Sequence, residues 1–138
     1  MSGAESAPPR AASGVNEAHV AIVHGPLVGA VLGRVVGMLA ARAQCPIDRL
    51  DDALLITDAV AAHAPRFSAG DRVQVIVRTD DSALEIVVGS LVEGGTEGLV
   101  ADATLPGVGN VLERVADEVD KSPGADGEQL RIRVSFAS

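Results

Sequence analysis

Aromatic residues are almost absent from this chain of 138 residues, which contains two Phe, no Tyr and no Trp. Proteins that bind single-stranded nucleic acids commonly stack the bases on aromatic side chains. Basic residues are also scarce, because 11 Lys and Arg face 19 Asp and Glu, for a formal net charge of −8. Such a charge repels phosphate backbones. The composition therefore disfavours direct nucleic-acid binding and suits a basic or neutral protein partner, although solubility accounts for the charge equally well.

Cysteine and histidine are too sparse for a disulfide framework or a metal site. Cys45 is the only cysteine, which excludes an intramolecular disulfide and a cysteine-rich zinc site and is consistent with a cytoplasmic protein. His19, His24 and His63 fall on three different predicted elements, so we predict no metal site. The most apolar run, residues 20–43, carries Arg34 near its middle. We therefore expect no membrane-spanning segment.

The chain divides into a short tail and one domain. Residues 1–16 are small, polar and proline-containing, and we predict a disordered N-terminal tail there. Residues 17–138 have the length of a single domain with one hydrophobic core.

Hydrophobic periodicity predicts the secondary structure. Period two indicates strands and a 3.6-residue period indicates helices. Asp48 is a plausible N-cap for the second helix, and the residues between 89 and 107 show no clear period. Two consecutive helices before a hairpin favour an α/β two-layer sandwich with a four-stranded, mainly antiparallel sheet and helices on one face. The predicted strands are residues 19–24, 72–78, 84–88 and 130–136, the predicted helices are 27–43, 48–64 and 108–119, and 122–127 is a predicted loop.

The first predicted helix carries glycine at every fourth position. Gly25, Gly29, Gly33 and Gly37 form one stripe at helical spacing. We expect this stripe to allow close packing on the sheet or a neighbouring helix. A dimerisation face is the alternative. We favour packing within the domain, because glycine at every fourth position specifies helix association chiefly in lipid.

Three segments together carry a family signal. They are residues 51–62 on the second predicted helix, residues 84–90 with the glycine-rich run behind them, and residues 105–119 around Gly107-Val108-Gly109. In their order and spacing they resemble the histidine-kinase-like ATPase (Bergerat-type) fold, and most closely the small bacterial anti-sigma factor serine kinases. The resemblance covers about residues 18–138. It implies ATP and magnesium as cofactors, a sigma factor or an anti-sigma antagonist as partner, and a homodimer.

The nucleotide-binding motifs of that family are degraded in this chain. The resemblance implies a catalytic Glu and, one turn later, a magnesium-holding Asn, at positions occupied here by Asp58 and Ala62. The adenine-binding Asp falls at Ser90, and its two glycines fall at Val92 and Gly94. Ala62 supplies no metal ligand, and Val92 places a branched side chain where the backbone of the family approaches adenine.

The third motif survives as Gly107 and Gly109 before a predicted helix, a combination that can hold phosphate. A flexible loop followed by a helix start explains these two glycines equally well. Glu93, Glu97 and Asp102 fall where the family has its mobile ATP lid. They would repel a triphosphate, so we interpret that segment as a solvated acidic loop.

Three functions remain open at this point. The first is an anti-sigma-factor-like regulator with a degenerate nucleotide site (Ser90, Gly94, Gly107 and Gly109), no cofactor, and a contact face on the first predicted helix with Arg34 and Arg42. The second is an active ATP-dependent serine-protein kinase, in which Asp58 is the catalytic base. The third is a domain that binds another small ligand in an apolar pocket lined by Ala62 and Val92.

Overall fold

A computed structural model describes residues 15–124 and 126–137 of the chain. Residues 1–14 of the predicted tail lie outside this part. Asn16, the last residue of the predicted tail, already belongs to the first strand. The elements in chain order are β1 (Asn16–Val23), α2 (Leu27–Arg42), α3 (Ile47–His63), η2 (Ala64–Phe67), β2 (Arg72–Thr79), β3 (Ala83–Leu91), α4 (Gly95–Asp102), β4 (Thr104–Leu105), β5 (Gly109–Asn110), α5 (Val111–Val115), β6 (Glu118–Gly124) and β7 (Gly127–Ser135).

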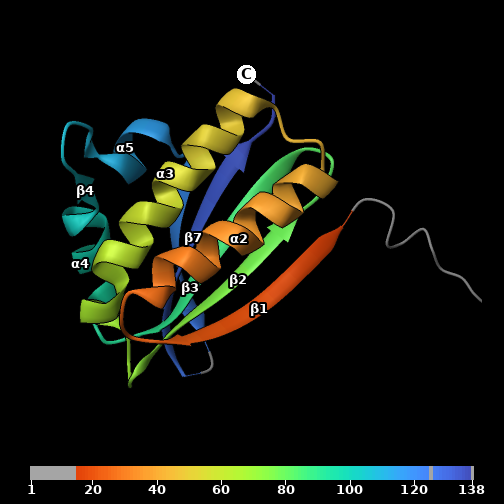
Figure 1. The fold of residues 1–138 in the computed structure, drawn as a ribbon. Coiled ribbons are helices and arrows are strands. Elements are labelled where there is room, and N and C mark those ends of the chain that lie inside the picture. The colour runs from red at the N-terminus through yellow and green to blue at the C-terminus, as the bar shows by residue number, and fades with distance from the viewer. Residues whose placement is uncertain (1–14, 125, 138) are drawn as a thin grey trace, which may run out of the picture.

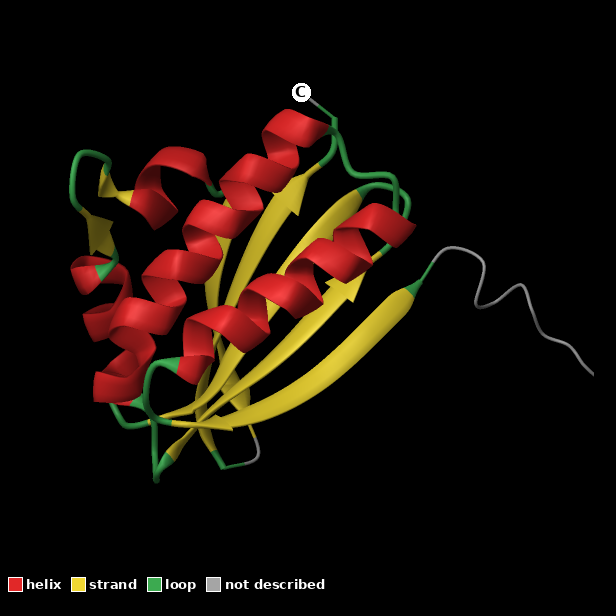
Figure 2. Cartoon of the chain, viewed as in Figure 1, coloured by secondary structure: helices red, strands yellow, loops and turns green. Residues whose placement is uncertain are grey.

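The fold is an α/β sandwich of two layers. Five strands form one sheet in the order β1-β2-β3-β7-β6, and every neighbouring pair is antiparallel. The helices cover one face of this sheet, with α2 and α3 side by side and α4 and α5 beyond α3 (Figures 1 and 2). In the described residues, the helices lie on this one side of the sheet (Figure 2). The predicted class, the antiparallel sheet and the one-sided helical layer are confirmed.

Strand alternation supplies the core, because successive side chains point to opposite faces. Val73, Val75 and Val77 of β2 point toward the helices and are at most 2% exposed. The same holds for the alternating Leu and Ile positions of β3 and β7. The β2–β3 turn is fixed by Asp80, whose Oδ1 accepts hydrogen bonds from the N–H groups of Ser82 (2.7 Å) and Ala83 (3.0 Å). The bonds from Ser82 in particular lower the pKa of Asp80.

The C-terminal third differs from the sequence-based prediction. The predicted helix over 108–119 is only α5, of five residues. Of the predicted loop over 122–127, residues 122–124 end β6 and Gly127 begins β7, while residue 125 lies outside the described part. The chain leaves the helix at Ala116 because Asp117 is held in an extended connection: its N–H donates to the carbonyl of Arg133 at 2.9 Å. The sheet therefore has five strands where four were predicted.

Two other local predictions are wrong. The segment 89–107 is not irregular throughout, because β3 continues to Leu91 and α4 follows from Gly95. Asp48 is not the N-cap of α3; Pro46 occupies that position without a side-chain hydrogen bond, and Asp48 lies in the first turn. Asp48 still stabilises the helix there, because a carboxylate in the first turn faces the positive end of the helix dipole.

The glycine stripe of α2 serves close packing at one position. A Cβ at Gly29 would lie 3.4 Å from the Cβ of Ala61 on α3, so this glycine lets the two helices approach. A Cβ at Gly33 or at Gly37 would have no atom of a neighbouring element within 4 Å. The expectation of close packing on a neighbouring helix therefore holds for Gly29.

We expect Gly33→Ala to stabilise the protein by about 0.5–1 kcal/mol, because alanine removes backbone entropy from the unfolded chain and meets no atom in the folded one. Gly98→Ala is the contrasting variant, since its Cβ would lie 2.4 Å from Cε1 of Phe67, and we expect it to destabilise. Urea denaturation followed by far-UV circular dichroism measures both. Equal effects of the two variants would contradict the packing described here.

Candidate functional site

The first part of the predicted site lies on α3. Asp58 and Ala62 are one helical turn apart and both are exposed to solvent. At this spacing the two side chains share one face of the helix, as the resemblance implies. Their neighbour His63 hydrogen-bonds through Nε2 to the carbonyl of Thr104 at 2.8 Å, which ties the end of α3 to β4. Asp58 is thus a solvated carboxylate, and Ala62 offers no oxygen beside it.

Ser90 lies at the other face of the sheet. A β-bulge interrupts the pairing of β3 with β7 between Val88 and Leu91 and changes which face the strand end presents. Ser90 lines a shallow depression of about 220 Å³ on the helix-free face, together with His19, Gln74 and Gln129. Asp58 stands in the helical layer. The structure therefore does not bring Ser90 and Asp58 together.

Gly94 sits at the start of α4, where a carboxylate of the chain already occupies the backbone donors. Gly94 adopts a left-handed conformation with φ +76° and is the N-cap of α4. Its N–H donates to Oε2 of Glu128 at 2.9 Å, and the Thr96 N–H donates to Oε1 at 3.1 Å. The hydroxyl of Thr96 also donates to Oε1. Glu128, on β7, thus supplies the anion that a helix N-terminus attracts.

These three hydrogen bonds, led by the one from the Thr96 hydroxyl, lower the pKa of Glu128 from 4.5 to about 2. A lowered pKa means that ionised Glu128 stabilises the folded state fully above pH 4.5 and that this contribution is lost as the pH falls toward 2. We expect Glu128→Gln to lower Tm at pH 7 by several degrees and to flatten the decline of Tm between pH 5 and pH 2. The exposed Glu93→Gln serves as control, with no such effect. A Tm at pH 7 equal to that of the wild type would contradict this role of Glu128.

Gly107 lies in the turn between β4 and β5, and Gly109 is the first residue of β5, where it pairs with Leu105. Both are exposed, with φ of +80° and +87°, conformations that glycine adopts without strain. The following helix α5 begins with its own cap, because Oδ1 of Asn110 accepts the Glu113 N–H at 3.1 Å. The Val111 N–H is also used, by the carbonyl of Ala103 at 2.8 Å. A tight turn and a capped helix start therefore explain the two glycines without a phosphate.

The segment between β3 and α5 is anchored in the core. Leu99 and Leu112 are fully buried, as are Ala103 and Val111. Glu93 and Glu97 are exposed, as predicted for an acidic surface, and Asp102 pairs with Arg66 at 2.8 Å. The expected irregular acidic loop is thus a helix with an acidic outer side and an apolar inner side.

Two polar arrangements were missed by sequence reasoning. The first is a clamp made by Arg49 of α3, whose Nε donates to the Ser135 carbonyl at 2.8 Å. Its two terminal nitrogens bind Asp52, at 2.5 Å, and Asp117. Asp117 in turn accepts the Ser135 N–H at 2.7 Å. The clamp joins the start of α3 to the end of β7 and the entrance of β6.

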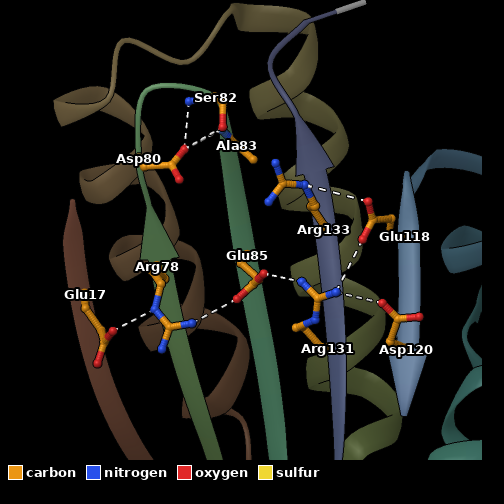
Figure 3. A network of polar contacts seen from close by, with 10 residues as sticks. All are labelled: Glu17, Arg78, Asp80, Ser82, Ala83, Glu85, Glu118, Asp120, Arg131 and Arg133. Atoms are coloured by element: carbon orange, nitrogen blue, oxygen red, sulfur yellow. Dashed lines mark hydrogen bonds and ion pairs between the residues drawn. The ribbon is translucent and has the colours of Figure 1, made fainter. Parts of the chain in front are cut away.

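The second missed arrangement crosses the helix-free face of the sheet (Figure 3). Arg78 donates to Glu17 at 2.7 Å and to Glu85 at 2.9 Å. Glu85 accepts Arg131, which also binds Asp120 at 2.8 Å. The network lowers the pKa of Glu17, mainly through His19 and then Arg78, and raises the pKa of Arg131, mainly through Glu85. Acidic and basic side chains therefore alternate across all five strands, and each forms a hydrogen bond with its neighbour of opposite charge.

Two further depressions are lined by residues of α4 and β6 and by residues of the β2–β3 turn. Of the predicted site residues, Ser90 lines the first depression, and Asp58, Gly94, Gly107 and Gly109 line none of the three. Ala62 and Val92, the predicted lining of an apolar pocket, are both exposed and are absent from these depressions as well.

Within residues 15–124 and 126–137, no group of three or more His, Cys, Asp or Glu side chains could hold a metal ion. In the same part of the chain, no helix has the length and hydrophobicity to cross a membrane. No family model and no curated protein matches the chain.

Proposed function

We propose that the chain is an anti-sigma-factor-like regulatory protein of the cytoplasm that acts by binding another protein and whose ATP site is degraded. The observation that carries this proposal is the position of Glu128. Its carboxylate takes the Gly94 and Thr96 N–H groups at the end of the hairpin, where the resemblance puts an adenine-binding glycine. A nucleotide there would have to displace an ionised side chain that belongs to the chain itself.

The remaining motif positions support the same proposal. Ala62 has no oxygen for magnesium, and Asp58 is an exposed carboxylate with no described partner. Ser90 is directed to the other face of the sheet, away from Asp58. A domain that retains the family's order of elements without these contacts would retain surfaces for partners and lose phosphotransfer.

The partner under this proposal is a sigma factor or an anti-sigma antagonist. The exposed Arg34 of α2 belongs to the contact face that we propose. Arg34 is a basic residue beside an acidic helix, because the neighbouring helix α3 exposes Asp48, Asp51 and Asp58. The net charge of −8 favours a partner that is basic or neutral as a whole, so we propose that only a local acidic group of this partner pairs with Arg34. The exposed aspartates of α3 would repel such a group and so restrict it to α2.

Binding of purified sigma factors from the source organism to the full-length protein tests the proposal. We expect a complex that forms equally well with and without ATP and magnesium. Arg34→Glu should weaken this complex at least about tenfold, since it places like charges together. Arg114→Glu, a change of the same charge on the exposed side of α5, should not. A complex that requires ATP, or no complex with any sigma factor or antagonist, would overturn the proposal.

A further inference from the structure

A groove, which we call the outer groove, lies between α4 and the outermost strand β6. It has a volume of about 420 Å³, within the range of about 300–1,000 Å³ that is common for small-molecule sites. Val119 of β6 pairs with Ile132, and Lys121 pairs with Leu130, so these side chains project on the side of the sheet that the helices cover. Lys121 is nevertheless exposed and Val119 only half-buried, which shows that the helical layer leaves this strand open.

The floor of the outer groove is apolar. Leu130 of β7 is 1% exposed and belongs to the core. Val100 of α4 and Val119 of β6 line the groove beside it, are partly buried and pack against the same core. The hydroxyl of Thr96, which also lines the groove, is already donated to Glu128. A ligand in the groove would therefore contact hydrocarbon along the floor, and burial of its own hydrocarbon there would be favourable.

Carboxylates outnumber cations at the rim of the outer groove. Glu97 of α4 lies three residues before Val100 and so shares its side of the helix, and Glu113 lies in the first turn of α5. Both are exposed, and within the part of the chain that the structure describes neither forms an ion pair. Lys121, the single lysine of the chain, is the one cationic residue among those that line the groove in this described part.

The charge of Lys121 acts on a further carboxylate as well as on the groove. Hydrogen bonds, above all the one from the Thr96 hydroxyl, lower the pKa of Glu128, and the positive charge of Lys121 contributes to the same lowering. The lining itself holds two carboxylates and one ammonium, and the whole chain carries a net charge of −8. The electrostatic potential at the rim therefore favours a positively charged group of a ligand.

We propose that the outer groove binds an apolar amine, a small molecule with a short hydrocarbon chain or ring and one ammonium group. The hydrocarbon lies over Val100, Val119 and Leu130, and the ammonium lies beside Glu97 and Glu113 at the rim. Burial of the hydrocarbon supplies most of the affinity, and the two carboxylates select the charge of the head group. This inference depends neither on ATP nor on a sigma factor.

An NMR titration of the nitrogen-15-labelled full-length protein with octylammonium chloride tests the proposal. We expect saturable shifts of the α4 and β6 amide signals, with a dissociation constant of about 1 mM or lower. Butylammonium should bind at least about tenfold more weakly, because fewer methylene groups are buried. Octanoate, which has a similar chain and the opposite charge, should bind at least about fivefold more weakly. Octanoate binding as tight as that of octylammonium, shifts confined to other elements, or no saturation up to about 10 mM would overturn the proposal.

Charge variants of the rim test where the ammonium binds. Glu97→Gln and Glu113→Gln should each weaken octylammonium binding about threefold, and Lys121→Gln should strengthen it by a similar factor, because a like charge is removed. Glu93→Gln is the matched control, since Glu93 is exposed just before α4 and does not line the groove. Equal effects of Glu97→Gln and Glu93→Gln, or weaker binding to Lys121→Gln, would contradict the proposed site. Circular dichroism of each variant shows that it is folded.

Discussion

Leu112→Ala should destabilise the protein by about 3 kcal/mol. Leu112 is 1% exposed and is part of the same core as Leu99 and Val111. Removing a fully buried leucine side chain costs about 2–5 kcal/mol, because its contacts are lost and a cavity remains. The effect bears on function, since Leu99 of the same core belongs to α4, and Glu93, Glu97 and Asp102 at and before α4 lie where the resemblance implies a mobile lid. A segment anchored by such a residue does not open without breaking the core.

Urea denaturation measures the free energy of unfolding of this variant, and amide hydrogen exchange measures the opening of α4 and α5. Glu113→Ala is the control, because Glu113 is exposed on the same helix and only its N–H is used in the cap. We expect that variant to lie within about 0.5 kcal/mol of the wild type. Exchange of the α4 amides that is fast in the wild type and unchanged by Leu112→Ala would contradict the anchored segment.

Arg49→Ala should cost about 2 kcal/mol of stability. The guanidinium is only 17% exposed and binds a carbonyl and two carboxylates on three different parts of the chain. Hydrogen bonds to charged groups contribute about 1.5–3 kcal/mol, and the 43% exposure of Asp117 reduces its share through solvent screening. Arg49→Lys should recover only part of the loss, because one ammonium cannot replace the planar fork of donors.

A double-mutant cycle with Asp117→Ala separates this clamp from general packing. We expect a coupling energy of about 1 kcal/mol between Arg49 and Asp117, read from urea denaturation of the two single variants and the double variant. Arg72→Ala is the control, since Arg72 is 53% exposed and its nearest carboxylate oxygen is 3.8 Å away. Additive effects of Arg49→Ala and Asp117→Ala would mean that the clamp does not act as a unit.

The sequence predicted the parts of the fold that depend on local periodicity. The alternating valines of β2 and the apolar stripe of α2 are visible within seven or eight residues, and the strands and helices they imply are present. The fifth strand was missed because β6 contains Pro123 and several charged residues, a composition suited to a sheet edge and to a loop alike. The end of α5 was missed because Asp117 is held by Arg49, 68 residues away along the chain.

The candidate site was less predictable for a related reason. Sequence reasoning placed Ser90 with the other motif residues, but a bulge in the pairing of β3 and β7 alters the direction of the strand end. Glu128 carries no local signal, since a glutamate in an alternating strand resembles any solvated position. Its role depends on contact with Gly94, 34 residues earlier. Leu27 and Met38 follow the hydrophobic period of α2 yet are 65% and 56% exposed, because their burial depends on where α2 lies relative to the outermost strand.

Isothermal titration calorimetry of the purified full-length protein with ATP and ADP, with and without magnesium, tests the degraded site most directly. The absence of Trp and Tyr makes intrinsic fluorescence a poor probe of binding. Glu128 and Ala62 lead us to predict no binding heat up to millimolar nucleotide, from a sample that circular dichroism shows to be folded. Micromolar, magnesium-dependent binding would contradict the account and favour an active serine-protein kinase with Asp58 as its base, which loss of phosphotransfer in Asp58→Asn would then establish.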